Sequence, residues 1–217
     1  MKKDTILCMF SGGIDSTGAL WKLLNDKEYS EFNIHVHHVN LINKENRAKA
    51  EYNASFAIIK EMSDLGVRPF GFSSSVLDTS FLVKPIFNRF LFDAESNAYM
   101  SASICLCNTS IRRVVVGYIH EDWKDSEGNF NKGTDERMKT VENIFNATLS
   151  AYPVDKYELP FYDYILLDHN KQQVWNGLPE SIRKLTHTCR HPQYGVNDRV
   201  ITCNKCHGCE ARKALES

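Results

Sequence analysis

Residues 11–17, S-G-G-I-D-S-T, combine the residue types that a phosphate-binding loop needs. They follow a short apolar run, residues 5–10, that predicts a buried strand, and they precede leucines at helical spacing. Two glycines let backbone N–H groups approach an anion, and a helix N-terminus adds the positive end of its dipole. The loop residues expected to hold phosphate are Ser11, Gly12, Gly13, Asp15, Ser16 and Thr17.

Asp15 is an unusual residue for an anion site. Its carboxylate is explained if it helps to hold Mg²⁺ beside the phosphates, or if it caps the helix. The loop is not a P-loop of the G-x-x-x-x-G-K-[ST] kind, since no lysine follows the glycines, and it is not G-x-G-x-x-G either. A Ser/Gly turn that only caps an ordinary helix is the alternative interpretation.

A second group of chemically capable residues is the cysteine cluster near the C-terminus, with the spacing C-x(13)-C-x-x-C-x-x-C. Four thiolates form a tetrahedral Zn²⁺ site without an open position, so the zinc is expected to be structural. An iron–sulfur cluster and free thiols are the alternatives. Nearby His187, His191 and His207 are not expected to be ligands. The expected metal ligands are Cys189, Cys203, Cys206 and Cys209.

The chain of 217 residues has a hydrophobic fraction of 42% and a formal net charge of -1, which suit one α/β domain without a general affinity for nucleic acid. No run of about 18 apolar residues predicts a transmembrane helix, and the N-terminus is typical of a first strand rather than a signal peptide. We therefore expect a cytoplasmic protein with no membrane partner. Cys8, Cys105 and Cys107 are expected to be buried small hydrophobic residues.

Apolar periodicity predicts strands that alternate with helices. The expected strands are 5–10, 33–40, 67–74 and 113–119, and the expected helices are 15–25, 46–65, 95–108, 135–149 and 168–177. Segment 76–92 is ambiguous, and 121–133 is expected to be a loop. This order predicts an α/β fold with a parallel twisted sheet covered by helices on both faces, of the Rossmann type, with ligands beyond the carboxyl ends of the strands. Residues 1–180 should form the main domain, and 181–217 a zinc-binding segment packed on it.

The loop resembles the PP-loop of N-type ATP pyrophosphatases, whose signature is S-G-G-x-D-S at the end of the first strand. Together with the C-x-x-C-x-x-C tail, it makes the chain similar to the family of 7-cyano-7-deazaguanine synthases. Gly117 followed by Asp122 resembles the family's G-V-x-x-x-D segment, and Lys171 resembles a lysine just before its late helix. The resemblance spans nearly the whole chain, although only its two ends are specific.

The resemblance implies an ATP-dependent ligase that releases pyrophosphate and converts 7-carboxy-7-deazaguanine and ammonia to 7-cyano-7-deazaguanine. It implies Mg²⁺ and structural zinc as metals, ATP as co-substrate, and a homodimer. Asp15, Ser16 and Lys171 would be catalytic, and Gly117 would join the loop in binding ATP. No acid–base residue is identified, and adenylation depends mainly on positioning and charge neutralisation.

Three segments depart from the family pattern where the second substrate should bind. V-N-L-I-N replaces Tyr-Gly-Gln, A-E-S-N retains only Asn97 of Pro-Gly-Arg-Asn, and a longer stretch from Trp123 replaces Gly-Tyr-Pro-Asp-Cys-Arg. A PP-loop enzyme acting on another base, a tRNA or a protein therefore remains an alternative. A nucleotide-sensing module without turnover is a second one.

A few other residues could border the site. Arg47 and Lys49 are expected on an exposed helix face, with phosphate binding as the alternative. His35, His37 and His38 are expected to be buried and hydrogen-bonded. Trp123 and Phe130 are expected to pack, with stacking on a purine-like base as the alternative.

Overall fold

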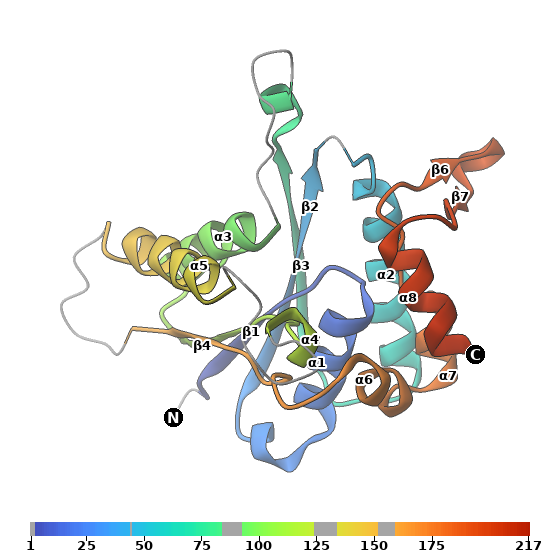
Figure 1. Cartoon of the computed structure of the whole chain (residues 1–217). Coiled ribbons are helices and arrows are strands. Elements are labelled where there is room, and N and C mark those ends of the chain that lie inside the picture. The colour runs from blue at the N-terminus through green and yellow to red at the C-terminus, as the bar shows by residue number, and fades with distance from the viewer. Residues whose placement is uncertain (1–2, 44, 84–92, 124–133, 152–158) are drawn as a thin grey trace.

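The chain is built around one parallel sheet, as the computed structural model shows for residues 3–43, 45–83, 93–123, 134–151 and 159–217 (Figure 1). The strand order is β3-β2-β1-β4-β5, and every neighbouring pair is parallel. The strands are β1 (Thr5–Met9), β2 (Asn33–Ile42), β3 (Gly71–Asp78), β4 (Ile111–Val115) and β5 (Phe161–Asp163).

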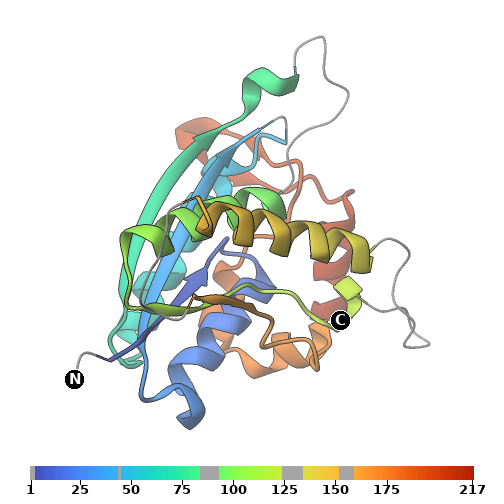
Figure 2. The same ribbon diagram turned by 90° about the vertical axis from the view of Figure 1, so that its left-hand side faces the viewer.

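Helices cover both faces of this sheet (Figures 1 and 2). Residues of β1 alternate between the two cores, because successive side chains of a strand point to opposite faces: Ile6 and Cys8 face one core, and Leu7 and Met9 the other. The first core contains side chains of α1 (Ile14–Asn25), α2 (Ala48–Asp64), α6 (Lys171–Gly177) and α7 (Glu180–Leu185). The second contains side chains of α3 (Asp93–Cys107) and α5 (Thr134–Leu149).

The C-terminal segment lies beside α2. It contains a two-stranded antiparallel pair, β6 (Gln193–Tyr194) and β7 (Val200–Ile201), and ends with α8 (His207–Glu216). The Tyr194 hydroxyl donates to the carbonyl of Asn46 at 2.8 Å, which joins this segment to the start of α2. The boundary at residue 180 stays a prediction.

The α/β class and the parallel sheet with helices on both faces are confirmed. The predicted bounds of two strands were wrong: β3 spans Gly71–Asp78 instead of 67–74, and β4 spans Ile111–Val115 instead of 113–119. Residues 120–123 form a helical turn, α4, where a loop was expected, because the Asp122 carboxylate accepts the Ile119 N–H and stabilises it. The helix α8 was not predicted. Residues 84–92 and 124–133 lie outside the described part of the chain.

The three cysteines outside the C-terminal cluster differ in exposure. Cys8 and Cys105 are buried, and burial raises the pKa of each thiol to about 12, which keeps them unreactive. The prediction was wrong for Cys107, which is exposed. In α3 it lies two residues beyond Cys105, so the helical period turns it away from the sheet. Among the described helices, none is long and apolar enough to cross a membrane.

Candidate functional site

The loop after β1 folds into a tight turn that only glycine permits at one position. Gly12 has φ 77°, and a Cβ there would lie 2.9 Å from both the backbone N and the Oγ of Ser55. Gly13 is the N-cap of α1, where backbone N–H groups lack helical partners. The sequence pattern of strand, glycine turn and helix therefore has the geometry expected of an anion cradle.

Hydroxyl groups stabilise this turn from within. Ser16 Oγ and Thr17 Oγ1 donate to the Gly13 carbonyl at 3.2 and 2.7 Å, and the Ser11 N–H donates to Ser16 Oγ at 3.2 Å. Thr17 is fully buried, so its hydroxyl lies behind the loop. Ser11, Gly13, Asp15 and Ser16 line the adjoining cleft.

This cleft has a volume of about 540 Å³ and lies beyond the carboxyl ends of β1 and β4, where open parallel sheets bind ligands. Its described wall comes from seven places in the chain: the phosphate loop, the connection between β2 and α2, α3, the segment after β4, α5, the segment of β5 and the cysteine segment. Tyr118, Trp123, Tyr162 and Tyr164 form an aromatic part of this wall.

Asp15 and Lys171 meet at the edge of the loop, with Lys171 Nζ 3.1 Å from Asp15 Oδ2. Burial raises the pKa of Asp15 to about 6, although the ammonium of Lys171 opposes the shift. Lys171 is the first residue of α6, whose start is fixed by a capping box between Asn170 and Gln173. The Lys171 N–H also donates to Glu121 Oε1 at 2.9 Å. Lys171, which the resemblance marks as catalytic, therefore lies against the phosphate loop.

Gly117 lies directly against the phosphate loop. A Cβ at this position would lie 2.4 Å from Ser16 N and 2.5 Å from Ser16 Cα. Backbone contact this close excludes any side chain, so Gly117 lets the end of β4 support the first turn of α1. Asp122, five residues later, also lines the cleft. Burial raises the pKa of its carboxyl group.

Arg47 contradicts the expectation of an exposed helix face. It is only 6% exposed and forms ion pairs with three carboxylates: Glu45, Glu51 and Asp93. Burial of a guanidinium is tolerated because these carboxylates surround it. Burial also raises the pKa of Glu51 to about 7. The i,i+4 spacing of Arg47 and Glu51 was visible in the sequence, but Asp93 arrives from α3.

Arg190 brings the C-terminal segment into the cleft. Its Nη1 lies 3.7 Å from Glu45 Oε2 and 3.5 Å from Asp93 Oδ2, and all three residues line the cleft. Sequence reasoning missed this residue, because only its position after Cys189 set it apart.

The remaining candidate residues lie in or near the site or outside the described part of the chain. Trp123 is 7% exposed and makes edge contacts with Tyr118 and Tyr164, so it packs as expected. It also lines the cleft, and the alternative of stacking on a base stays a prediction. Lys49 is ion-paired with Asp198 at 2.6 Å. Phe130 lies outside the described residues. The histidines of β2 are not among the cleft residues. His35 and His37 bond to Ser73, and His38 is buried with its Nδ1 2.8 Å from the Phe10 carbonyl oxygen, as expected. Among the described residues, its Nε2 has no hydrogen-bond partner.

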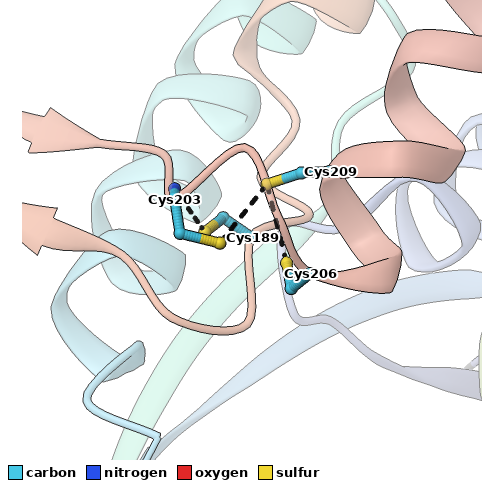
Figure 3. A group of neighbouring side chains, drawn as sticks. All are labelled: Cys189, Cys203, Cys206 and Cys209. Carbon is cyan, nitrogen blue, oxygen red and sulfur yellow. Dashed lines mark hydrogen bonds between the residues drawn. The ribbon is translucent and has the colours of Figure 1, made fainter.

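The four C-terminal cysteines converge as predicted (Figure 3). Their sulfur atoms all lie within 4.8 Å of one another, and Cys209 Sγ lies 3.9 Å from Cys203 Sγ and 3.6 Å from Cys206 Sγ. A zinc ion with Zn–S bonds of about 2.3 Å requires sulfurs about 3.8 Å apart, so the four thiolates fit one tetrahedral ion. Within the described residues, no histidine joins this group.

The cysteine segment also contacts the phosphate loop. The His187 N–H donates to the Gly12 carbonyl at 2.9 Å, and the His187 side chain bonds to the Cys189 carbonyl at 2.9 Å. Backbone N–H groups point at the sulfurs, among them those of Cys203 to Cys189 Sγ and of Arg190 to Cys206 Sγ. The cysteine cluster and the loop after β1 are therefore parts of one connected structure.

Comparison with known proteins adds the family. A family model described as "Queuosine biosynthesis protein QueC" matches residues 5–216. No curated protein matches the sequence. Among solved structures, the U34-tRNA thiolase NcsA from Methanococcus maripaludis with its [4Fe-4S] cluster matches at 12% identity and a TM-score of 0.49. That alignment covers 98% of this chain and 63% of the thiolase. The chain belongs to the QueC family.

Proposed function

We propose that this enzyme uses ATP to convert 7-carboxy-7-deazaguanine and ammonia to 7-cyano-7-deazaguanine, releasing AMP and pyrophosphate. The observation that carries the proposal is the glycine turn after β1, which leads into the N-terminus of α1 beside a cleft large enough for a nucleotide and a second substrate. Membership of the QueC family supports the choice of acceptor.

The chemistry begins with a carboxylate, whose oxygen is a poor leaving group. A carboxylate oxygen attacks the α-phosphorus of ATP, the bond to the β-phosphate oxygen breaks, and pyrophosphate leaves. Ammonia then attacks the acyl carbon, AMP leaves with the old C–O electron pair, and a proton is lost to give the amide. The amide oxygen attacks a second ATP in the same way, and loss of AMP and two N–H protons leaves the nitrile.

The residues of the loop have separate roles in this proposal. The N–H groups around Gly13 and the hydroxyls of Ser11 and Ser16 hold the departing phosphates. Lys171, paired with Asp15 in this structure, neutralises phosphate charge as it develops. Asp15 would hold Mg²⁺, which would supply charge neutralisation on the phosphates. Thr17, Gly12 and Gly117 act behind the loop by fixing its shape.

We propose structural zinc for the four cysteines. The sulfur spacing supports a single ion, since a four-iron cluster binds each cysteine to a different iron and spreads the sulfurs further apart. We also propose, from the family resemblance alone, that the enzyme is a cytoplasmic homodimer without a nucleic-acid partner.

The test is pyrophosphate release from purified protein with Mg-ATP, with and without 7-carboxy-7-deazaguanine and ammonium, while nucleobase products are followed by mass. Substrate-dependent release together with a nitrile product is the expected result. Asp15→Asn should abolish it, and Asp26→Asn, a matched change at an exposed residue at the opposite end of α1, should not.

Two other outcomes would overturn the proposal in different ways. Pyrophosphate release that ignores this substrate would retain the ATP chemistry but require another acceptor, such as a base, a tRNA or a protein. Binding of ATP without pyrophosphate under any of these conditions would favour a nucleotide-sensing module.

A further inference from the structure

One part of the cleft wall is lined by charged side chains instead of hydroxyl groups and aromatic rings. Glu45 comes from the connection between β2 and α2, Asp93 from the start of α3, and Arg190 from the cysteine segment. Three segments far apart in sequence thus place two carboxylates and one guanidinium together in the proposed active site.

Arg47 fixes the two carboxylates from behind. It binds Glu45 through Oε2 and Asp93 through Oδ2. In the described part of the chain, the second oxygen of each carboxylate makes no hydrogen bond or ion pair, so it is available to a ligand. A carboxylate oriented through one oxygen is a preorganised acceptor through the other.

Arg190 supplies a donor beside these acceptors. Its side chain is 51% exposed and meets Glu45 and Asp93 only through Nη1, at 3.5 to 3.7 Å, which is too long for a strong bond. Its backbone is held by the N–H bond to Cys206 Sγ at 3.3 Å. The guanidinium therefore projects from a fixed point and retains donors for a ligand.

The charge balance indicates what kind of group fits. Glu45 and Asp93 are balanced by Arg47 and Arg190, and Glu51, buried behind Arg47, leaves the group at most one charge negative. Such a wall repels phosphate but suits a neutral edge that carries both N–H donors and a carbonyl. A guanine-type ring has such an edge: a ring N–H, an adjacent exocyclic amine and a carbonyl oxygen.

We propose that Glu45, Asp93 and Arg190 are specificity-determining residues that recognise the pyrimidine edge of the deazaguanine ring. The two carboxylates accept the ring N–H and the exocyclic amine, and Arg190 donates to the carbonyl oxygen. This inference rests on the proposed function, because it assigns the acceptor of that same site. It also gives the cysteine segment a direct part in binding substrate.

The experiment compares wild type, Asp93→Asn and Arg190→Gln, with Arg199→Gln as the matched control, since Arg199 is exposed on the same segment. KM and kcat are measured for ATP, for 7-carboxy-7-deazaguanine and for its analogue without the exocyclic amine. Arg190→Gln should raise KM for the deazaguanine about 10–100-fold and leave KM for ATP within about twofold. Arg199→Gln should change neither value.

Asp93→Asn tests the contact with the exocyclic amine, because removing the carboxylate and removing the amine should have effects on KM that are not additive. Wild type should discriminate against the analogue without the amine by about 100-fold or more, and the variant should lose most of this discrimination. Zinc content and melting temperature, measured in parallel, identify a variant that is misfolded. If Asp93→Asn is misfolded, Arg190→Gln still tests the proposal, because the Arg190 side chain is half-exposed and its substitution should not disturb folding.

The two proposals fail in distinguishable ways. If wild type forms the nitrile but both variants keep wild-type KM and discrimination, the recognition by Asp93 and Arg190 is wrong while the proposed function stands. If wild type releases pyrophosphate only with another acceptor, both are wrong.

Discussion

The ammonium of Lys171 lies 3.1 Å from the carboxylate of Asp15, which joins the first turn of α1 to the first residue of α6. Asp15 lies in the phosphate loop, and Lys171 lies more than 150 residues later in the chain. The contact therefore brings two distant segments together at the phosphate loop. Burial makes the carboxylate costly to ionise, and the lysine partly offsets that cost. A phosphate chain with Mg²⁺ would offer each group a new partner of opposite charge.

Lys171→Met should lower the rate of ATP-dependent pyrophosphate release about 100-fold or more, because a charge that neutralises the departing phosphates is lost. Lys22→Met is the control, since Lys22 pairs with Asp26 at 2.6 Å near the C-terminal end of α1. Steady-state kinetics with saturating Mg-ATP measures both. Equal rates for the two variants would contradict a catalytic role for Lys171.

The raised pKa of Asp15 predicts a pH-dependent stability. Because its folded pKa is about 6 and its usual value is 3.8, the native state binds the proton more tightly than the unfolded chain. The stabilisation from this proton is complete below about pH 4 and is lost as the pH rises through 6. Asp15→Asn should therefore stabilise the protein by about 1–3 kcal/mol at pH 8 and much less at pH 4.

Urea unfolding of wild type and Asp15→Asn at both pH values measures this difference. Asp26→Asn should show no such pH dependence of its effect, since Asp26 is exposed. A stability change that is equal at pH 4 and pH 8 would show that Asp15 is not the titrating group.

The parts of the site that the sequence predicts well are those formed by contiguous residues. The glycine turn and its hydroxyls lie within seven positions, and its strand and helix flank it directly, so local patterns suffice. The cysteines are similar, because three of them lie within seven residues around the start of α8 and the fourth lies only 14 positions earlier. Side-chain type and spacing then determine the geometry.

The parts that the sequence did not predict depend on contacts between distant segments. The sequence predicts that Arg47 is an exposed helical residue, but in the structure α3 places Asp93 beside it. The sequence does not distinguish Arg190 from a surface residue, but in the structure the cysteine segment places it in the cleft wall. The early end of β4 has the same origin, since the partner strand β5 spans only three residues. Contacts between distant segments override the local pattern in each case.

Gly117→Ala should destabilise the protein by about 1–3 kcal/mol and weaken ATP binding, because its Cβ would lie 2.4 Å from Ser16 N and push the loop away. Gly177→Ala is the matched control: no atom lies within 4 Å of the added carbon, so stability should be unchanged or slightly higher. Thermal unfolding and calorimetric titration with an ATP analogue measure the two effects. Normal ATP affinity in Gly117→Ala would refute the steric argument.

Removal of the metal should weaken nucleotide binding as well as stability. The His187 N–H donates to the Gly12 carbonyl, so a loss of structure around the cysteines should also change the position of the phosphate loop. We expect one zinc per chain, no visible absorbance, and lower affinity for pyrophosphate after chelation or in Cys189→Ser. Metal analysis, absorption spectra and pyrophosphate titration test this. A brown protein, or unchanged affinity in the metal-free form, would contradict it.

Arg47→Met should cost about 3–5 kcal/mol of stability at pH 8, because it leaves Glu45 and Glu51 buried without their counter-charge. Glu51 already has a pKa of about 7, and loss of the arginine must raise it further, since Arg47 lowers it in the wild type. At pH 5 Glu51 is then neutral, so the loss should be clearly smaller. Lys49→Met, which removes a half-exposed cation two residues away, should cost little at either pH. Denaturant unfolding at pH 5 and 8 decides the matter, because a loss in Arg47→Met that does not vary with pH would mean that packing, not charge, holds Arg47 in place.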